Sequence, residues 1–407
     1  MKYLKTDYLD DEWSVTGNEE DRFRSFIKEV AETTYTKVIS PENFLIYSLL
    51  GFHRKKDEAF RVITIEPDSA SLGIMLLNSK GCYFSDKNHN IGYITFETLK
   101  ENGVTDTQIQ EIEEAGFFLQ YRTEKKALTL LPSKMLLATL CRQLGIGKLN
   151  SGPEPLRDIY LASQMSRRKK FKIVYRKYQG KAKAFACFGL KYHAEPQTIV
   201  LKIIDYLRMC RAFDNIKVHR WKICHSSTTV ELVFPSMQLK LNDINILPGV
   251  RLTTSDIGDS SYILENILCI NEHTIILKDS IAKKHTSELD VESFVEQYKK
   301  NVFPGLILIM TRIKNLETIK VSSKKIVLSS LLKKAKFNQV IGTKNMAKFK
   351  KRLEQLTDKE CSGMDVVLEL LSIPGYLHDL GIEPTERSTK AIGMILSFDL
   401  IGELRTC

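Results

Sequence analysis

Strand-like runs joined by short turns dominate the middle of the chain and constrain its fold most. Residues 171–192 hold two β-rich runs around Gln179 and Gly180, which predicts a hairpin. A second hairpin is predicted with its turn at residues 226–228, and a helix with an apolar face at 196–213 separates the two. The pattern predicts about six strands packed by one or two helices. The strand-like runs lie at residues 171–192, 215–236, 246–256 and 261–270.

The whole chain is expected to be an α+β protein with a central mixed or antiparallel sheet and packed helices. Its 407 residues exceed the roughly 250 to 300 at which one core stops growing, so several packed units are expected. We predict an N-terminal α+β module at 1–150, a central β-rich domain at 151–290 and a mainly helical region at 291–407. Pro374 and Gly375 are expected to break the penultimate helix.

Net charge, hydropathy and cysteine content limit the classes of protein to which this chain can belong. The net charge of +11 and the pI near 9.1 favour a polyanionic partner. No apolar run approaches the roughly 18 residues of a membrane span, and the N-terminus lacks the pattern of a signal peptide. We therefore expect a cytoplasmic protein that does not bind membranes. The eight cysteines form no C-x-x-C pair, which indicates reduced thiols and no disulfide framework.

The first basic run extends from Arg167 to Lys183 and holds nine cations and no acid, interleaved with aromatic residues. Cations neutralise phosphates and exposed rings stack on unpaired bases, so the mixture suits single-stranded nucleic acid. Strand alternation would place most of the rings in a core, and the alternative is a hairpin whose solvated face is basic. The candidate nucleic-acid-binding residues here are Arg167, Arg168, Lys169, Lys170, Lys172, Arg176, Lys177, Lys181 and Lys183.

The second basic run, from Arg312 to Arg352, carries thirteen cations against one acid, Glu317. Two separate acid-poor runs favour a polyanionic partner more strongly than a single run would. A solvated helix face is the alternative explanation. The candidate residues are Lys324, Lys325, Lys333, Lys334, Lys336, Lys348, Lys350, Lys351 and Arg352.

Catalytic signals are sparse. No phosphate-binding loop, dinucleotide fingerprint, zinc-protease, esterase or calcium-loop pattern occurs. Asp256, Asp259 and His285 are the candidate catalytic residues, since two carboxylates and an imidazole can hold a divalent cation. A tight turn around Gly258 is the alternative. No metal site is expected at His219, Cys224 and His225, because alternation places Cys224 on the opposite face of a strand.

Short motifs between about residues 132 and 400 resemble a phage/plasmid-like protein family catalogued as a domain of unknown function. KAFACFGLKYHAEP is similar to that family's alanine-to-tyrosine strand, PGVRLTTSDIGDSS to its Asn-Ser-Glu-x-Gly-x-Ser segment, and CIN to its Cys-x-Asn-Gly segment. The helical residues 364–396 are also similar, and His285 falls where the family often has a histidine. The resemblance implies an origin in a mobile element and supplies no established activity.

Together these patterns favour a nucleic-acid-binding accessory protein over an enzyme. The expected partner is DNA or RNA, including single strands as in recombination-type annealing, bound with little sequence preference. A metal-dependent nuclease or phosphoryl-transfer enzyme using Asp256, Asp259 and His285 is one alternative. A virion or protein-interaction component is the other. No cofactor is expected apart from a divalent cation in the enzyme alternative, and homo-oligomer formation is left open.

Overall fold

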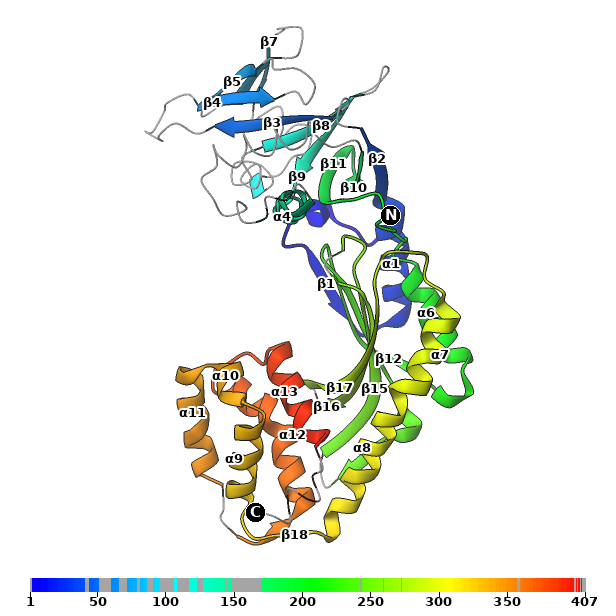
Figure 1. Ribbon diagram of the computed structural model, residues 1–407, viewed down its shortest axis with the longest axis vertical. Helices are drawn as coiled ribbons and strands as arrows, with labels where there is room; N and C mark the ends of the chain where they lie inside the picture. The colour runs from blue at the N-terminus through cyan, green and yellow to red at the C-terminus, as the bar shows by residue number, and fades with distance from the viewer. Residues whose placement is uncertain are drawn as a thin grey trace.

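The computed structural model describes most of the chain, and for the strands between 44 and 129 it describes the backbone alone. It shows an α+β protein with two large sheets and a mainly helical C-terminal region (Figure 1). The mixed and antiparallel sheets with packed helices confirm the predicted fold class. The described residues are 2–40, 44–50, 60–65, 72–78, 81–85, 91–95, 106–107, 117–122, 127–143, 145, 147, 170–241, 244–258, 260–271, 273–356, 359–398, 400, 402 and 404.

An antiparallel sheet, here called the central sheet, takes up seven of the described strands. Its order is β1-β12-β13-β15-β16-β17, and β14 pairs with β15. Val230, Leu232 and Val250 are 0% exposed on one face, whereas the opposite face carries charged residues, as alternation along a strand requires. The strands are β1 (Ser14–Gly17), β12 (Lys217–Cys224), β13 (Thr228–Val233), β14 (Leu239–Leu241), β15 (Ile244–Thr254), β16 (Tyr262–Ile270) and β17 (His273–Lys283).

Helices cover the apolar face of the central sheet. Figure 1 shows α6, α7 and α8 running along one side of it. The rings of Phe23 and Phe26 in α1 lie 5.7 and 5.8 Å from that of Trp221 in β12. A Cβ at Gly17 would lie 2.4 Å from the Trp221 ring, so only glycine allows this close approach. The helices are α1 (Glu20–Thr33), α6 (Ile199–Met209), α7 (Val291–Asn301) and α8 (Phe303–Asn315).

A second sheet contains ten described strands in the order β2-β10-β11-β9-β8-β3-β4-β5-β6-β7. The pair β11–β9 is parallel and the others are antiparallel, so this sheet is mixed. The α4 helix (Lys134–Gln143) packs on β11. The strands are β2 (Thr34–Ile39), β3 (Phe44–Leu50), β4 (Phe60–Ile65), β5 (Leu72–Asn78), β6 (Gly81–Ser85), β7 (Ile91–Thr95), β8 (Phe117–Arg122), β9 (Ala127–Pro132), β10 (Phe171–Tyr178) and β11 (Lys181–Phe188).

The two predicted hairpins both form, but they lie in different sheets. The first hairpin, β10–β11, pairs with β2 and β9 and so belongs to the second sheet. The second, β12–β13, belongs to the central sheet. The sequence pattern groups the two hairpins together, because it contains no information about which strands pair with one another. The boundary predicted near residue 150 stays a prediction, since residues 148–169 lie outside the described part.

The C-terminal region is helical, and one expectation about it is wrong. Helix α12 continues through Pro374, which the sequence marks as a break. Pro374 is buried in the helix together with Leu370, Ile373 and Leu377. Burial of this apolar face compensates for the backbone hydrogen bond that proline cannot donate. The elements are α9 (Lys324–Lys334), α10 (Phe337–Ile341), α11 (Thr343–Glu354), α12 (Gly363–Asp379) and α13 (Glu386–Leu396), with the short strands β18 (Lys320–Val321) and β19 (Cys361–Ser362).

Candidate functional site

The β10–β11 hairpin carries the first basic run and forms as predicted. Gln179 and Gly180 have φ values of +47° and +79°, the left-handed pair that a tight hairpin turn requires. Lys170 and Lys177 are exposed, whereas Lys172 donates a hydrogen bond to the Tyr192 carbonyl. Few of the described cations of this run therefore face solvent. Arg167, Arg168 and Lys169 lie outside the described residues.

Arg176 lies in a buried polar network, so its predicted contact with phosphate is wrong. Its side chain is 0% exposed, and Nη2 donates to both carboxylate oxygens of Asp256 at 2.9 and 3.0 Å. Nη1 contacts Nδ1 of His225, and Nε donates to Oγ1 of Thr34 at 3.3 Å. The guanidinium also stacks over the Phe185 ring at 4.9 Å. A guanidinium enclosed in this way stabilises the fold and cannot reach a polyanion.

Lys183 and the aromatic residues of the hairpin are likewise internal. The Lys183 ammonium pairs with Asp11 at 2.9 Å, with side chains 1% and 4% exposed. Phe171, Tyr175 and Tyr178 are 5%, 6% and 8% exposed. The predicted phosphate contact of Lys183 and the predicted stacking of these rings on bases are therefore wrong. Because both faces of this part of the sheet are largely covered, these side chains point inward.

The polar turn after β15 holds the candidate catalytic residues. Asp256 is buried, and both its oxygens accept from Arg176, so the carboxylate is already occupied. His285 is 6% exposed, and its Nε2 lies 3.1 Å from the Ser260 carbonyl, to which it donates. Gly258 has φ +74°, as the tight-turn alternative requires. Asp259 lies outside the described residues. The described geometry thus assigns Asp256 and His285 to holding the turn.

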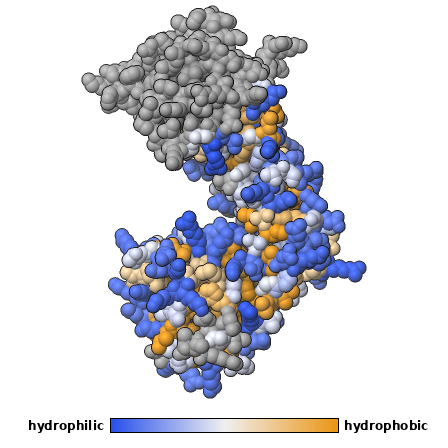
Figure 2. Space-filling view, in the orientation of Figure 1, coloured by the Kyte–Doolittle hydropathy of each residue, from blue (hydrophilic) through white to orange (hydrophobic). Residues whose placement is uncertain are grey.

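The second basic run forms an exposed surface on α9, α10 and α11, here called the basic surface. No Asp or Glu occurs between residues 318 and 353. Lys324 and Lys325, at the start of α9, are half-buried, and Lys324 pairs with Glu369 at 3.5 Å. Figure 2 shows mainly hydrophilic residues over this region. The exposed cations are Lys333, Lys334, Lys336, Lys344, Lys348, Lys350, Lys351 and Arg352.

Aromatic rings support two cations of the basic surface. The Arg352 guanidinium lies 4.7 Å from the centre of the Tyr376 ring in α12. The Lys334 ammonium lies 5.3 Å from the Phe398 ring. A cation over a ring face is held in place while its charge stays accessible to water. The two rings therefore hold these two cations of the basic surface in place.

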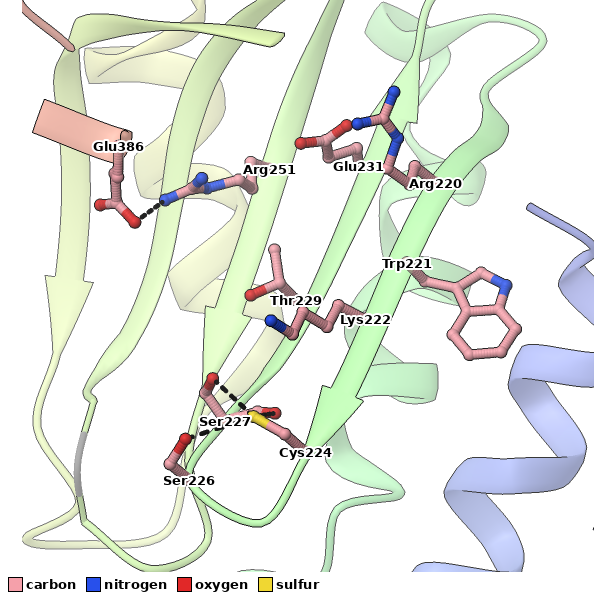
Figure 3. A pocket seen from close by; sticks show the side chains of 10 residues that line it. All are labelled: Arg220, Trp221, Lys222, Cys224, Ser226, Ser227, Thr229, Glu231, Arg251 and Glu386. Atoms are coloured by element: carbon pink, nitrogen blue, oxygen red, sulfur yellow. Dashed lines mark hydrogen bonds and ion pairs between the residues drawn. The ribbon is translucent and has the colours of Figure 1, made fainter. Parts of the chain in front are cut away.

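An open groove crosses the charged face of the central sheet (Figure 3). Neighbouring strands place Arg220 beside Glu231, Glu231 beside Arg251, and Arg251 beside Glu265. Arg251 bonds Glu265 at 2.8 Å and Glu386 of α13 at 2.9 Å. Burial opposes ionisation of Glu386, but Lys390 and Arg251 together hold its pKa below the usual value. Cations and anions thus alternate across this face of the sheet, and Arg220, Glu231, Arg251 and Glu386 of this set line the groove.

Cys224 lies at one end of this groove. Its Sγ contacts Oγ of Ser226 at 3.2 Å and the Ser227 carbonyl at 3.3 Å. Burial raises the thiol pKa, but hydrogen bonds from Ser226 and Ser227 outweigh burial and leave it below the usual value. A lowered pKa makes a thiol a better nucleophile and metal ligand. The sequence pattern gave no sign of this environment, because the two serines act through the turn geometry.

Comparison with known proteins adds no relative: no family model, curated protein or solved structure matches this chain. The resemblance to the phage/plasmid-like family therefore stays a prediction. Within the described residues, no helix is long and apolar enough to cross a bilayer.

Proposed function

We propose that this protein binds DNA or RNA through the basic surface of α9–α11, with little sequence preference. In this proposal it is an accessory protein of a phage or other mobile element and acts in the bacterial cytoplasm. Single strands of the kind handled in recombination are the favoured form. Arg176 and Lys183 of the first basic run do not take part, because both are buried in ion pairs.

The observation that carries the proposal is the unmixed charge of the basic surface. Eight exposed cations lie within residues 333–352, and no acid interrupts them between 318 and 353. A solvated helix face in an ordinary protein mixes both signs, which favours solubility and limits long-range attraction. Charge of one sign instead attracts a polyanion and releases its counterions on binding.

Salt dependence provides the test. If about six of these cations contact phosphates, affinity should fall roughly 10³-fold between about 50 and 200 mM salt. Fluorescence anisotropy of labelled single- and double-stranded oligonucleotides across this series measures the fall. Oligonucleotides recovered intact after incubation with magnesium would distinguish binding from the nuclease alternative.

A matched pair of triple variants assigns the binding to this surface. Lys348→Gln, Lys350→Gln and Lys351→Gln together should lower the salt slope by about three, one for each lost contact. Lys202→Gln, Lys240→Gln and Lys300→Gln remove the same charge from exposed positions outside the basic surface. If both triple variants weaken binding equally, net charge alone is responsible and the proposed surface is incorrect.

A further inference from the structure

Three side chains of different ligand type converge on the charged face of the central sheet. They are His219 of β12, Glu231 of β13 and Cys269 of β16. One ligand atom of each, an imidazole nitrogen, a carboxylate oxygen and Sγ, lies within 4.8 Å of the other two. Cys269 is 1% exposed and Glu231 is 8% exposed, whereas His219 is half-buried. The sequence could not reveal this group, because three separate strands contribute it.

A β-bulge brings His219 to this face. In the β12–β13 register, Val218 pairs with Leu232 and Arg220 pairs with Glu231, so His219 is an extra residue on β12. Leu232 faces the apolar core at 0% exposure, and without the bulge His219 and Arg220 would face opposite ways. An inserted residue re-aims the side chains beside it, and such bulges are common next to functional sites.

A threonine orders the two buried members of the group. Oγ1 of Thr274, the partner of Cys269 on β17, donates to Oε2 of Glu231 at 2.8 Å. The same hydroxyl lies 3.8 Å from Sγ of Cys269. Val233 and Ile267 pack against Cys269 and close the inner side. A hydrogen bond that fixes a carboxylate in this way is typical of the outer shell of metal sites.

We propose that His219, Glu231 and Cys269 bind a divalent transition-metal ion of the zinc class. Mixed nitrogen, oxygen and sulfur donors suit Zn²⁺ and disfavour Mg²⁺ and Ca²⁺, which prefer oxygen alone. Tetrahedral bonds of about 2.0 to 2.3 Å place ligand atoms roughly 3.3 to 3.8 Å apart. A side-chain shift of about 1 Å therefore closes the site.

Glu231 belongs to the group and also lines the groove, and His219 is half-buried. In this proposal, the fourth ligand position therefore opens toward the groove. Three protein ligands with one open position are the arrangement that leaves zinc able to bind water or an external oxygen. The bound ion would thus place an electrophilic centre in the groove. The proposed nucleic-acid function does not use this groove.

Direct titration of the full-length protein tests the site. After removal of metal with a chelator, Zn²⁺ is titrated against a competing indicator, and Co²⁺ binding is followed by absorption. We expect one ion per chain and a thiolate-to-cobalt charge-transfer band. Cys269→Ser should abolish the band. His219→Ala should weaken Zn²⁺ binding by more than the roughly 10- to 100-fold typical of an outer-shell change, which Thr274→Val should produce.

Cys361→Ser provides the matched control, since Cys361 is a half-buried thiol outside the group. This variant should keep both the band and the affinity. His219 is only half-buried, so His219→Ala keeps the test valid even if Cys269→Ser fails to fold. Absence of stoichiometric binding, or binding that neither Cys269→Ser nor His219→Ala weakens, would overturn the proposal.

Discussion

The two basic runs of this chain look alike in sequence and end in opposite environments. In the β10–β11 hairpin, Arg176 and Lys183 become internal ion pairs with Asp256 and Asp11. On α9–α11 the cations remain in water. The difference follows from periodicity, because most side chains of a strand in a covered sheet are buried, whereas an amphipathic helix keeps one solvated face. A basic run therefore indicates a binding surface only when its secondary structure leaves it a solvated face.

The largest expected effect is the loss of stability when the buried ion pair of Arg176 and Asp256 is broken. Asp256→Ala leaves the Arg176 guanidinium buried without its carboxylate and should cost about 3 to 5 kcal/mol of unfolding free energy. Urea unfolding followed by circular dichroism measures the change. Glu288→Ala, at an exposed acid, should change stability by less than about 0.5 kcal/mol. A small effect of Asp256→Ala would show that the hairpin charge is not structural.

A low pH should also lower the stability of this buried region. Burial and the charge of Arg176 lower the pKa of His225 well below its usual value, and burial lowers that of His285. Both imidazoles are then neutral in the folded chain, while the unfolded chain takes up protons below about pH 6.5. Their contribution to stability is thus complete above about 6.5 and falls as pH decreases, by up to about 1.4 kcal/mol per unit for each.

Urea midpoints at about pH 7.5 and 5.5 measure this loss, which should total roughly 1 to 3 kcal/mol at the lower pH. Equal stability at the two pH values would contradict the buried, neutral state of both histidines.

Exposed lysines of the two runs allow a direct comparison in binding. Lys350→Gln with Lys351→Gln should lower the salt slope by about two and weaken nucleic-acid binding roughly tenfold at moderate salt. Lys170→Gln with Lys177→Gln, on the hairpin, should leave affinity within about twofold. Anisotropy titrations at moderate salt measure the affinities, and a salt series measures the slope. A larger effect from the hairpin pair would reverse the assignment.

The smallest expected effect is the loss of stability when the N-cap of α9 is removed. Oγ of Ser323 caps this helix by accepting from the Ile326 amide at 3.2 Å. Ser323→Ala should cost about 1 kcal/mol of stability, the usual value for such a cap. Affinity for oligonucleotides should stay unchanged, since the exposed cations lie at the other end of α9 and beyond. Thermal unfolding and anisotropy on one preparation check both parts.

Local patterns in the sequence predicted more of the fold than of the site. The turn at Gln179 and Gly180 and the apolar face of α6 could be predicted because neighbouring residues determine them. The distribution of strands between two sheets could not, since it depends on pairing between distant segments. The same limit applies to the candidate site: Arg176 meets Asp256 across eighty residues, and a bulge rather than a motif brings His219 to Glu231.

The N-terminal segment also bears on how the chain must be made. Gly17 of β1 pairs with Trp221 of β12, and Arg176 of β10 pairs with Thr34 of β2. At a synthesis rate of about 5 to 20 residues per second, β1 waits roughly 10 to 40 s for its partner. During that interval the apolar face of α1, with Phe23 and Phe26, has no Trp221 to cover it. The ribosome-bound chain should therefore depend on chaperones until β12 emerges.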